Sequence, residues 1–158
     1  MKKFVIVLLS IVILMSYINV GAFATTNPTE SNSNSSIIYL NDGSYIVITM
    51  IQCSDFSRAA NTKTGKKTIT YYGGDDEIQW TATLLGTFSY NGSSATCTNA
   101  TISYSINNSI WDITTANASK SNNKAIGNVT AKRYFLGVPV QTVEQTTTIT
   151  CSATGVLS

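Results

Sequence analysis

Apolar and polar residues alternate through the middle of the chain, most regularly between Ile78 and Tyr90. One set of alternate positions holds Ile78, Trp80, Ala82, Leu84, Phe88 and Tyr90, and the other holds Gln79, Thr81, Thr83, Thr87 and Ser89. Successive side chains of a strand point to opposite faces, so this pattern predicts a strand with one buried face. Leu85 is an apolar exception among the polar positions, on the face expected to contact solvent. Gly86, inside the apolar series, predicts a bulge or a close approach of another backbone.

Turn residues divide the rest of the chain into short segments of the same kind. Asp42-Gly43 separates two apolar runs and Asn91-Gly92 ends the regular stretch, and both pairs tolerate the positive φ that a tight hairpin needs. Residues 54–67 are polar and lack a period, which predicts a loop. No segment of ten or more residues has a helical period. We therefore expect about eight strands in an antiparallel β-sandwich, with immunoglobulin-like topology as one arrangement and a barrel as the alternative.

Aromatic residues supply candidates both for the core and for ligand contact. Trp80 and Trp111 are predicted to be the largest core side chains, with exposed binding aromatics as the alternative. Tyr71 and Tyr72 end a predicted strand beside an acidic turn, where tyrosines can stack on sugars or anchor a protein. We take them as candidate ligand contacts, against the alternative that they reflect ordinary sheet propensity. Pro139, near the start of the last strand, predicts an edge position.

The first 24 residues read as a secretory signal peptide. Two lysines precede an apolar run from Phe4 to about Met15, and Ala22-Phe23-Ala24 forms a small-x-small cleavage step. Residues 25–36 contain no large apolar side chain and predict a flexible polar linker. Residues 37–158 then form a single domain. The mature protein is expected to be secreted, extracellular or loosely associated with the cell surface, with no membrane span after cleavage.

Charge after cleavage argues against a polyanionic partner. Loss of Lys2 and Lys3 leaves eight basic and eight acidic residues, so the net charge of the mature chain falls to zero. A neutral chain with scattered lysines has no electrostatic footprint for nucleic acid or for an anionic membrane. We therefore expect no nucleic-acid partner.

Three cysteines and the lack of histidine limit the chemistry. Thiols near each other tend to pair in an oxidising setting, and the similar surroundings of Cys97 and Cys151 predict a disulfide between them, worth roughly 4 kcal/mol at most. Cys53 would then be buried and inert, or free for an intermolecular bond. Without histidine, Cys-His and Ser-His catalysis and histidine-rich zinc sites are impossible.

Carboxylates are the remaining groups that could act on a substrate. Asp112 and Glu144 fall within predicted strands, and a facing pair would suit a glycoside hydrolase. The cluster Asp75-Asp76-Glu77 could offer oxygens to Ca²⁺, but it lacks the spacing of a dedicated calcium loop and predicts a solvated turn. We assign no catalytic residue, no cofactor and no metal.

Part of the chain resembles a group of small secreted β-rich proteins of Gram-positive anaerobic bacteria. The resemblance covers roughly residues 66–158, and its most specific pieces are the stretches YNGSSATC, residues 90–97, and TCS, residues 150–152. It implies that Cys97 and Cys151 belong together and that Cys53 is an addition. It supplies no activity.

These observations favour a secreted, non-enzymatic β-sandwich that acts as a binding module at the cell surface. Its expected partner is an unknown protein or a cell-envelope polysaccharide. The alternatives are a carboxylate-dependent glycoside hydrolase and, with less support, a β-rich pore-forming toxin.

Overall fold

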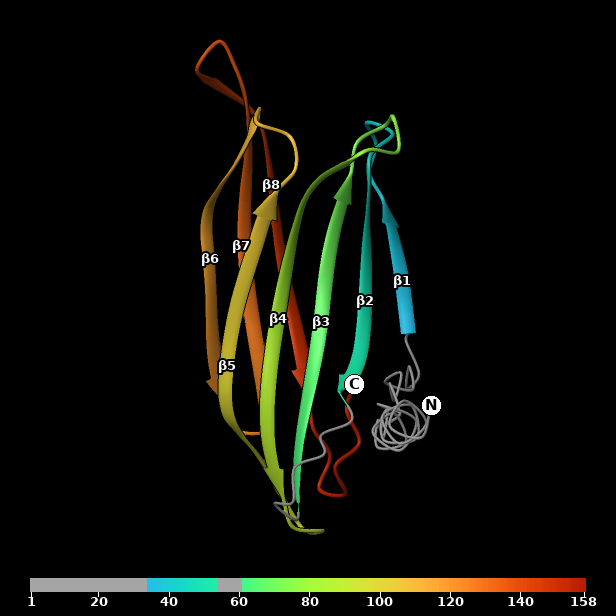
Figure 1. The fold of residues 1–158 in the computed structure, drawn as a ribbon, viewed down its shortest axis with the longest axis vertical. Helices are drawn as coiled ribbons and strands as arrows, with labels where there is room; N and C mark the ends of the chain where they lie inside the picture. Colours follow the sequence, from blue (N-terminus) through green and yellow to red (C-terminus); the bar gives the residue numbers. More distant parts are fainter. Residues whose placement is uncertain (1–33, 54–60) are drawn as a thin grey trace, which may run out of the picture.

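The computed structural model describes residues 34–53 and 61–158, which form eight antiparallel strands in two sheets (Figure 1). The strands are β1 (Asn34–Tyr39), β2 (Tyr45–Cys53), β3 (Thr62–Tyr72), β4 (Ile78–Tyr90), β5 (Ala95–Ile106), β6 (Trp111–Ser121), β7 (Lys124–Phe135) and β8 (Val138–Thr150). The predicted signal peptide and most of the predicted linker lie outside the described residues. No helix within the two described ranges has the length and hydrophobicity needed to cross a lipid bilayer.

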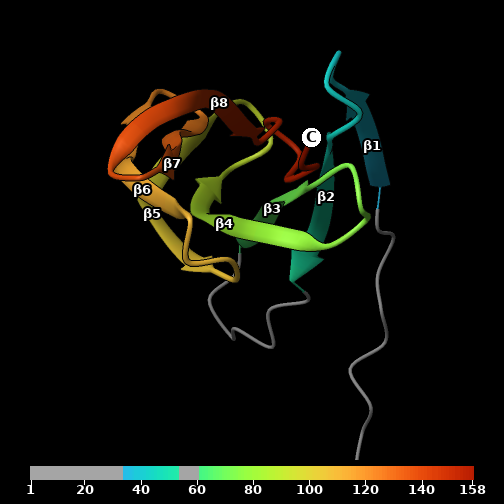
Figure 2. The ribbon, with the colours of Figure 1, turned by 90° about the horizontal axis from the view of Figure 1, so that it is seen from above.

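The larger sheet has the order β1-β2-β3-β4-β5 and the smaller sheet the order β6-β7-β8. This confirms the predicted sandwich of eight strands. Neighbouring strands follow each other in the sequence, so each sheet is a meander and lacks the crossovers of the immunoglobulin topology. Seen from above, β1 and β2 reach beyond the area that β6–β8 cover (Figure 2). Pro139 lies in β8, an edge strand, as predicted.

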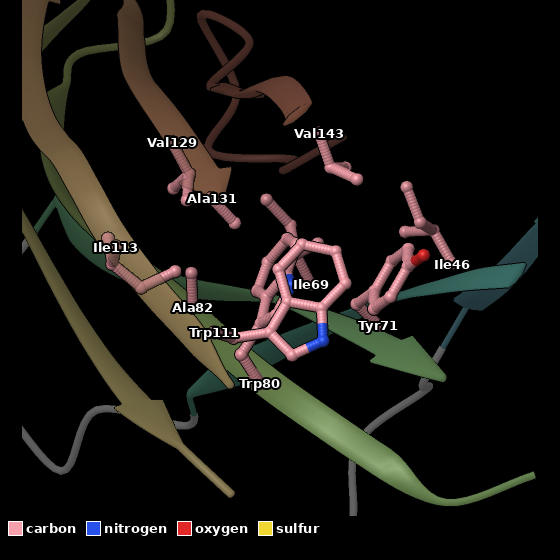
Figure 3. Packing of buried hydrophobic residues seen from close by; sticks show 10 residues of the cluster. All are labelled: Ile46, Ile69, Tyr71, Trp80, Ala82, Trp111, Ile113, Val129, Ala131 and Val143. Carbon is pink, nitrogen blue, oxygen red and sulfur yellow. The ribbon is translucent and has the colours of Figure 1, made fainter. Parts of the chain in front are cut away.

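The core forms two clusters along the sandwich. The cluster nearer the β3–β4 turn contains Trp80, which is completely buried, and Trp111, so both tryptophans are core residues as predicted (Figure 3). The Tyr71 ring is parallel to Trp80 at a centroid distance of 5.4 Å and meets Trp111 edge-on at 4.9 Å. The second cluster surrounds Leu84 and Phe88. The alternation between Ile78 and Tyr90 thus positions one face of β4 in both clusters.

Gly86 marks a close approach between the sheets, as its place in the apolar series predicted. A Cβ atom on Gly86 would lie 2.8 Å from the Cβ atom of Ala125 on β7 and 2.9 Å from the Phe88 ring. The β4–β5 register also shifts just after it, between Thr87 and Phe88. Only a residue without a side chain fits this contact.

Two predicted boundaries were wrong. β1 begins at Asn34, so residues 34–36 are strand and not linker. β3 begins at Thr62, so residues 62–67 are strand and not loop. Lys67 explains why the beginning of β3 was predicted to be loop, because a charged residue on the inner face breaks the apolar alternation. The Lys67 Nζ atom donates a hydrogen bond of 2.9 Å to the Thr148 carbonyl on β8, which satisfies it there.

The predicted disulfide was also wrong, because Cys97 and Cys151 are free thiols. The Cys97 amide donates to the Asn122 carbonyl and the Cys151 amide donates to the Asn123 carbonyl, so the β6–β7 turn lies between the two backbones. Each thiol instead contacts a carbonyl of its own segment, at 3.3 Å for Cys97 and 3.4 Å for Cys151. Both are buried in the second core cluster. They stabilise the fold by packing, as small apolar side chains do.

Candidate functional site

Alternate turns of the meander lie at one end of the sandwich, where they surround a cavity. Successive strands run in opposite directions, so the turns after β1, β3, β5 and β7 come together at the upper end in Figure 1. A cavity of about 510 Å³ opens between them. The first three of these turns and the strands of the β7–β8 hairpin contribute to its lining: Asp42 and Ser44; Gly73, Gly74 and Asp75; Asn108 and Ile110; Arg133 on β7 and Gln141 on β8.

A hydrogen-bonded network forms one wall of this cavity. The Asp42 carboxylate accepts the Ser44 backbone N–H at 3.1 Å and the Ser44 hydroxyl. Tyr71 Oη donates to Ser44 Oγ at 2.9 Å. Gln141 Nε2 donates to Asp42 Oδ2 at 2.8 Å and to Tyr71 Oη at 3.1 Å. The network therefore joins the β1–β2 turn to β3 and to the last strand.

Asp42 is held in its ionised form by these contacts. The hydrogen bond from the Ser44 hydroxyl, followed by the bond from the Ser44 amide, lowers the pKa of the carboxyl group below its ordinary value of 3.8. At neutral pH it is an acceptor of hydrogen bonds. It is poorly suited to donate a proton as a general acid.

A second network fixes the opposite wall. Asn108 Nδ2 donates to Gln79 Oε1 at 2.8 Å, and Gln79 Nε2 donates to the Glu77 carbonyl at 3.1 Å. The Gln79 carbonyl accepts the amides of Asn107 and Asn108 at 2.9 and 3.1 Å. Gln79 is buried, so these bonds are shielded from water. They tie the β3–β4 turn to the β5–β6 turn at the rim of the cavity.

Aromatic rings close the base of the cavity without offering free faces. Tyr71 and Trp111 both line it and both are buried. The Tyr71 ring packs against Trp80 on one side and against the edge of Trp111. Only its hydroxyl group takes part in the polar wall. A ligand here would be held mainly by hydrogen bonds, with little ring stacking.

Charged groups of both signs complete the lining. Asp42 and Asp75 bring carboxylates, and Arg133 brings a guanidinium group from the end of β7. Carboxylates accept hydrogen bonds only, whereas guanidinium donates only. Together with the side-chain amides, they can match a ligand that carries several hydroxyl groups.

The two tyrosines predicted to contact a ligand have different positions. Tyr71 lines the cavity through its hydroxyl group. Tyr72 is on the outer face of the larger sheet, where its ring stacks on Tyr45 at 4.7 Å. A row of three rings, completed by Tyr39 at 5.8 Å from Tyr45, crosses β1, β2 and β3 there. The structure therefore separates these neighbours in sequence by placing them on opposite faces of β3.

The predicted catalytic carboxylates do not meet at this cavity. Asp112 and Glu144 are exposed, and each follows a buried residue of the smaller sheet, Trp111 and Val143. They therefore point away from the space between the sheets. Of the acidic cluster, Asp75 lines the cavity, and its Oδ1 accepts the Glu77 amide at 3.3 Å. Among the described residues no group of three or more acidic or cysteine side chains could hold a metal ion.

Sequence reasoning missed Ser44, Gln79, Asn108 and Gln141 as site residues. One signal in the sequence could have found them. In a chain of antiparallel hairpins every second turn lies at the same end, so polar residues beside those turns are candidates for a shared site. The partners across the cavity are far apart in the sequence, for example Asp42 and Gln141. Comparison of the chain with protein-family models, with curated proteins and with solved structures finds no match.

Proposed function

We propose that this protein is a secreted, non-enzymatic binding module and that the cavity between its four turns holds a saccharide unit of a cell-envelope polysaccharide. The observation that carries the proposal is the lining of the cavity, in which residues from three turns and from strands β7 and β8 of the fourth hairpin converge on one space. Its volume falls within the range of about 300–1,000 Å³ that is common for small-molecule sites.

The chemistry of the lining favours a saccharide over an apolar ligand. Asp42 and Asp75 are acceptors for sugar hydroxyl groups, and Arg133 is a donor to them. A polar binding site whose side chains are already fixed loses little conformational entropy when a ligand binds. The hydrogen bonds of Asp42 with Ser44 and Gln141, and of Gln79 with Asn108, provide that order in the free protein.

The alternative function is a glycoside hydrolase that uses two carboxyl groups. Such an enzyme needs one carboxyl group that remains protonated near neutral pH and a second that faces it across the sugar. The lowered pKa of Asp42 disfavours it as the acid. The outward positions of Asp112 and Glu144 disfavour them as a pair across a cleft. We therefore rank binding above catalysis.

The proposal is tested by calorimetric titration of the chain from Thr25 onward with soluble fragments of envelope polysaccharides. Arg133→Gln and Asp75→Asn should each weaken binding about tenfold or more, because each removes a charged hydrogen-bonding partner. The matched controls are Lys132→Gln and Asp76→Asn, neighbours of the same type that do not line the cavity. Equal losses in the control variants, or no heat with any fragment, would contradict the proposal. Appearance of shortened fragments that Asp75→Asn abolishes would favour the hydrolase.

A further inference from the structure

The β7–β8 hairpin carries an exposed apolar tip. In Figure 1 this hairpin extends farther from the body than any other turn at the upper end. Its largest exposed side chains are Phe135 (67 %), Leu136 (89 %), Val138 (60 %) and Val140 (51 %). No charged residue occurs between Tyr134 and Val140. Isolated apolar residues on a surface are ordinary, but a contiguous protruding group of this size marks an interaction site.

The turn at the tip holds a leucine in a backbone conformation that leucine rarely adopts. Leu136 and Gly137 both have positive φ, 50° and 79°, in a two-residue hairpin turn closed by the pair Phe135 and Val138. Such turns usually begin with Asn, Asp or Gly, because a leucine side chain crowds its own backbone there. The other non-glycine residues with positive φ in the described chain are Asn61, Asp76 and Asn122. Leu136 is the one apolar member of this group, and it is the most exposed of the large hydrophobic side chains in the described residues.

Both faces of the hairpin are apolar near the tip. Phe135 and Val138 form one cross-strand pair, and Tyr134 and Pro139 form the next pair, which points to the other face. A flat protein surface would cover only one of these faces. A fluid apolar phase surrounds a convex tip on all sides, so the shape favours a lipid bilayer as the occupant.

The order of residues along the hairpin also matches a bilayer interface. Apolar residues at the tip are followed by Tyr134, a residue type that is enriched at the headgroup level, and then by Arg133 and Lys132. Arg133 is three positions before Leu136, the first residue of the turn, which is a span of about 10 Å along the strand. Interfacial segments typically bury their apolar side chains about 5–10 Å deep. The two basic side chains would then lie at the level of the lipid phosphates.

We propose that the β7–β8 hairpin inserts its tip into the interface of a phospholipid bilayer and so attaches the secreted protein reversibly to a membrane. Apolar contact provides most of the binding. The mature chain has no net charge, so we expect the preference for anionic lipid to be less than about tenfold. Arg133 also lines the proposed saccharide cavity, whereas the tip residues Phe135 and Leu136 do not, so variants at the tip test the membrane attachment alone.

The test is flotation of the chain from Thr25 onward with vesicles of phosphatidylcholine containing phosphatidylglycerol. Leu136→Asn removes the most exposed apolar side chain of the tip and places in the turn a residue that tolerates positive φ, so the hairpin keeps its fold. The matched control is Val156→Ser, which removes an equally apolar exposed side chain, 60 % exposed, from the C-terminal segment after β8. A Phe135→Trp variant reports insertion through a blue shift of its emission and through quenching by brominated lipid.

We expect the unchanged protein to float with the vesicles, Leu136→Asn to weaken the apparent affinity about tenfold or more, and Val156→Ser to change it less than about twofold. Lack of flotation with any vesicle would overturn the proposal, and so would equal binding by Leu136→Asn. Self-association in sedimentation that Leu136→Asn abolishes, without any vesicle binding, would assign the tip to a second copy of the chain and overturn it too.

Discussion

Tyr71 on β3 donates a hydrogen bond of 2.9 Å to the hydroxyl of Ser44, the residue before β2, and both are buried residues that line the cavity. The same tyrosine accepts a hydrogen bond from Gln141 on β8, the last strand of the other sheet. One hydroxyl group therefore links the two sheets at the end where the four turns meet. The polar wall of the cavity depends on this group remaining in place.

Replacement of Tyr71 by phenylalanine should destabilise the fold by about 1–2 kcal/mol, because Ser44 and Gln141 lose a buried partner. The ring packing on Trp80 is retained, so the loss reports the hydroxyl group alone. The free energy of unfolding in urea measures it. Tyr72→Phe is the control, since its hydroxyl is on the outer face, and it should change stability by less than about 0.5 kcal/mol. Equal losses of stability in the two variants would show that the hydrogen bonds of the Tyr71 hydroxyl do not contribute to the free energy of unfolding.

Gly86→Ala should destabilise the protein by about 1–3 kcal/mol, because the added methyl group would overlap Ala125 Cβ and the Phe88 ring at 2.8 and 2.9 Å. Gly74→Ala is the matched control, as the nearest atoms to its added Cβ are 3.7 Å away. Thermal unfolding of both variants measures the difference. A Gly86→Ala protein as stable as the Gly74→Ala protein would contradict the close approach of the two sheets.

Strand alternation predicted the architecture where one face of a strand is uniformly apolar, as between Ile78 and Tyr90. It failed at the beginning of β3, because Lys67 is on the inner face and satisfies its charge through a contact with Thr148, 81 positions further along the chain. Such a contact leaves no mark on local periodicity. Alternation also says nothing about the order of strands within a sheet, so it did not distinguish the two meanders from an immunoglobulin topology.

The cavity was less predictable than the fold for a similar reason. The sequence marks Asp42 and Asp75 only as acids near turns, and Gln141 only as one polar residue in a strand. To predict that these residues converge, one has to know that every second turn lies at the same end of the molecule. The cysteine pairing failed because similar sequence surroundings do not report the β6–β7 turn between Cys97 and Cys151.

Thiol reactivity should distinguish the three cysteines. Cys53 is half-buried, whereas Cys97 and Cys151 are buried in the core, so a water-soluble thiol reagent should modify Cys53 first in the folded protein. All three should react after unfolding in guanidinium chloride. Mass spectrometry of the labelled chain gives the sites. Modification of Cys53 alone in the unfolded, unreduced protein would instead indicate a bond between the other two.

The buried thiols should also make stability fall at alkaline pH. Burial raises the pKa of Cys97 and of Cys151 above the ordinary value of 9.0. The folded protein therefore retains protons that the unfolded chain loses, so this contribution is complete below about pH 9 and declines as pH rises through the raised values. Urea unfolding at pH 8 and pH 10 under reducing conditions measures the decline.

A Cys97→Ala, Cys151→Ala variant serves as the control for this pH dependence. Burial also raises the pKa of Tyr45 and lowers the pKa of Lys67, and both groups are retained in the variant. Their contributions cancel in the comparison with the unchanged protein. The variant should lose less stability between the two pH values. Identical losses would show that the two thiols titrate as they do in the unfolded chain.

The most direct test of the central claim is an NMR titration of the isotopically labelled protein with envelope saccharide fragments. Binding in the cavity predicts saturable shifts of the backbone signals of Gly73, Gly74, Asn108 and Arg133, with little change at Tyr72 and its neighbours on the outer face. Shifts confined to the outer tyrosine row, or no saturable shift at the four turns with any fragment, would contradict the account.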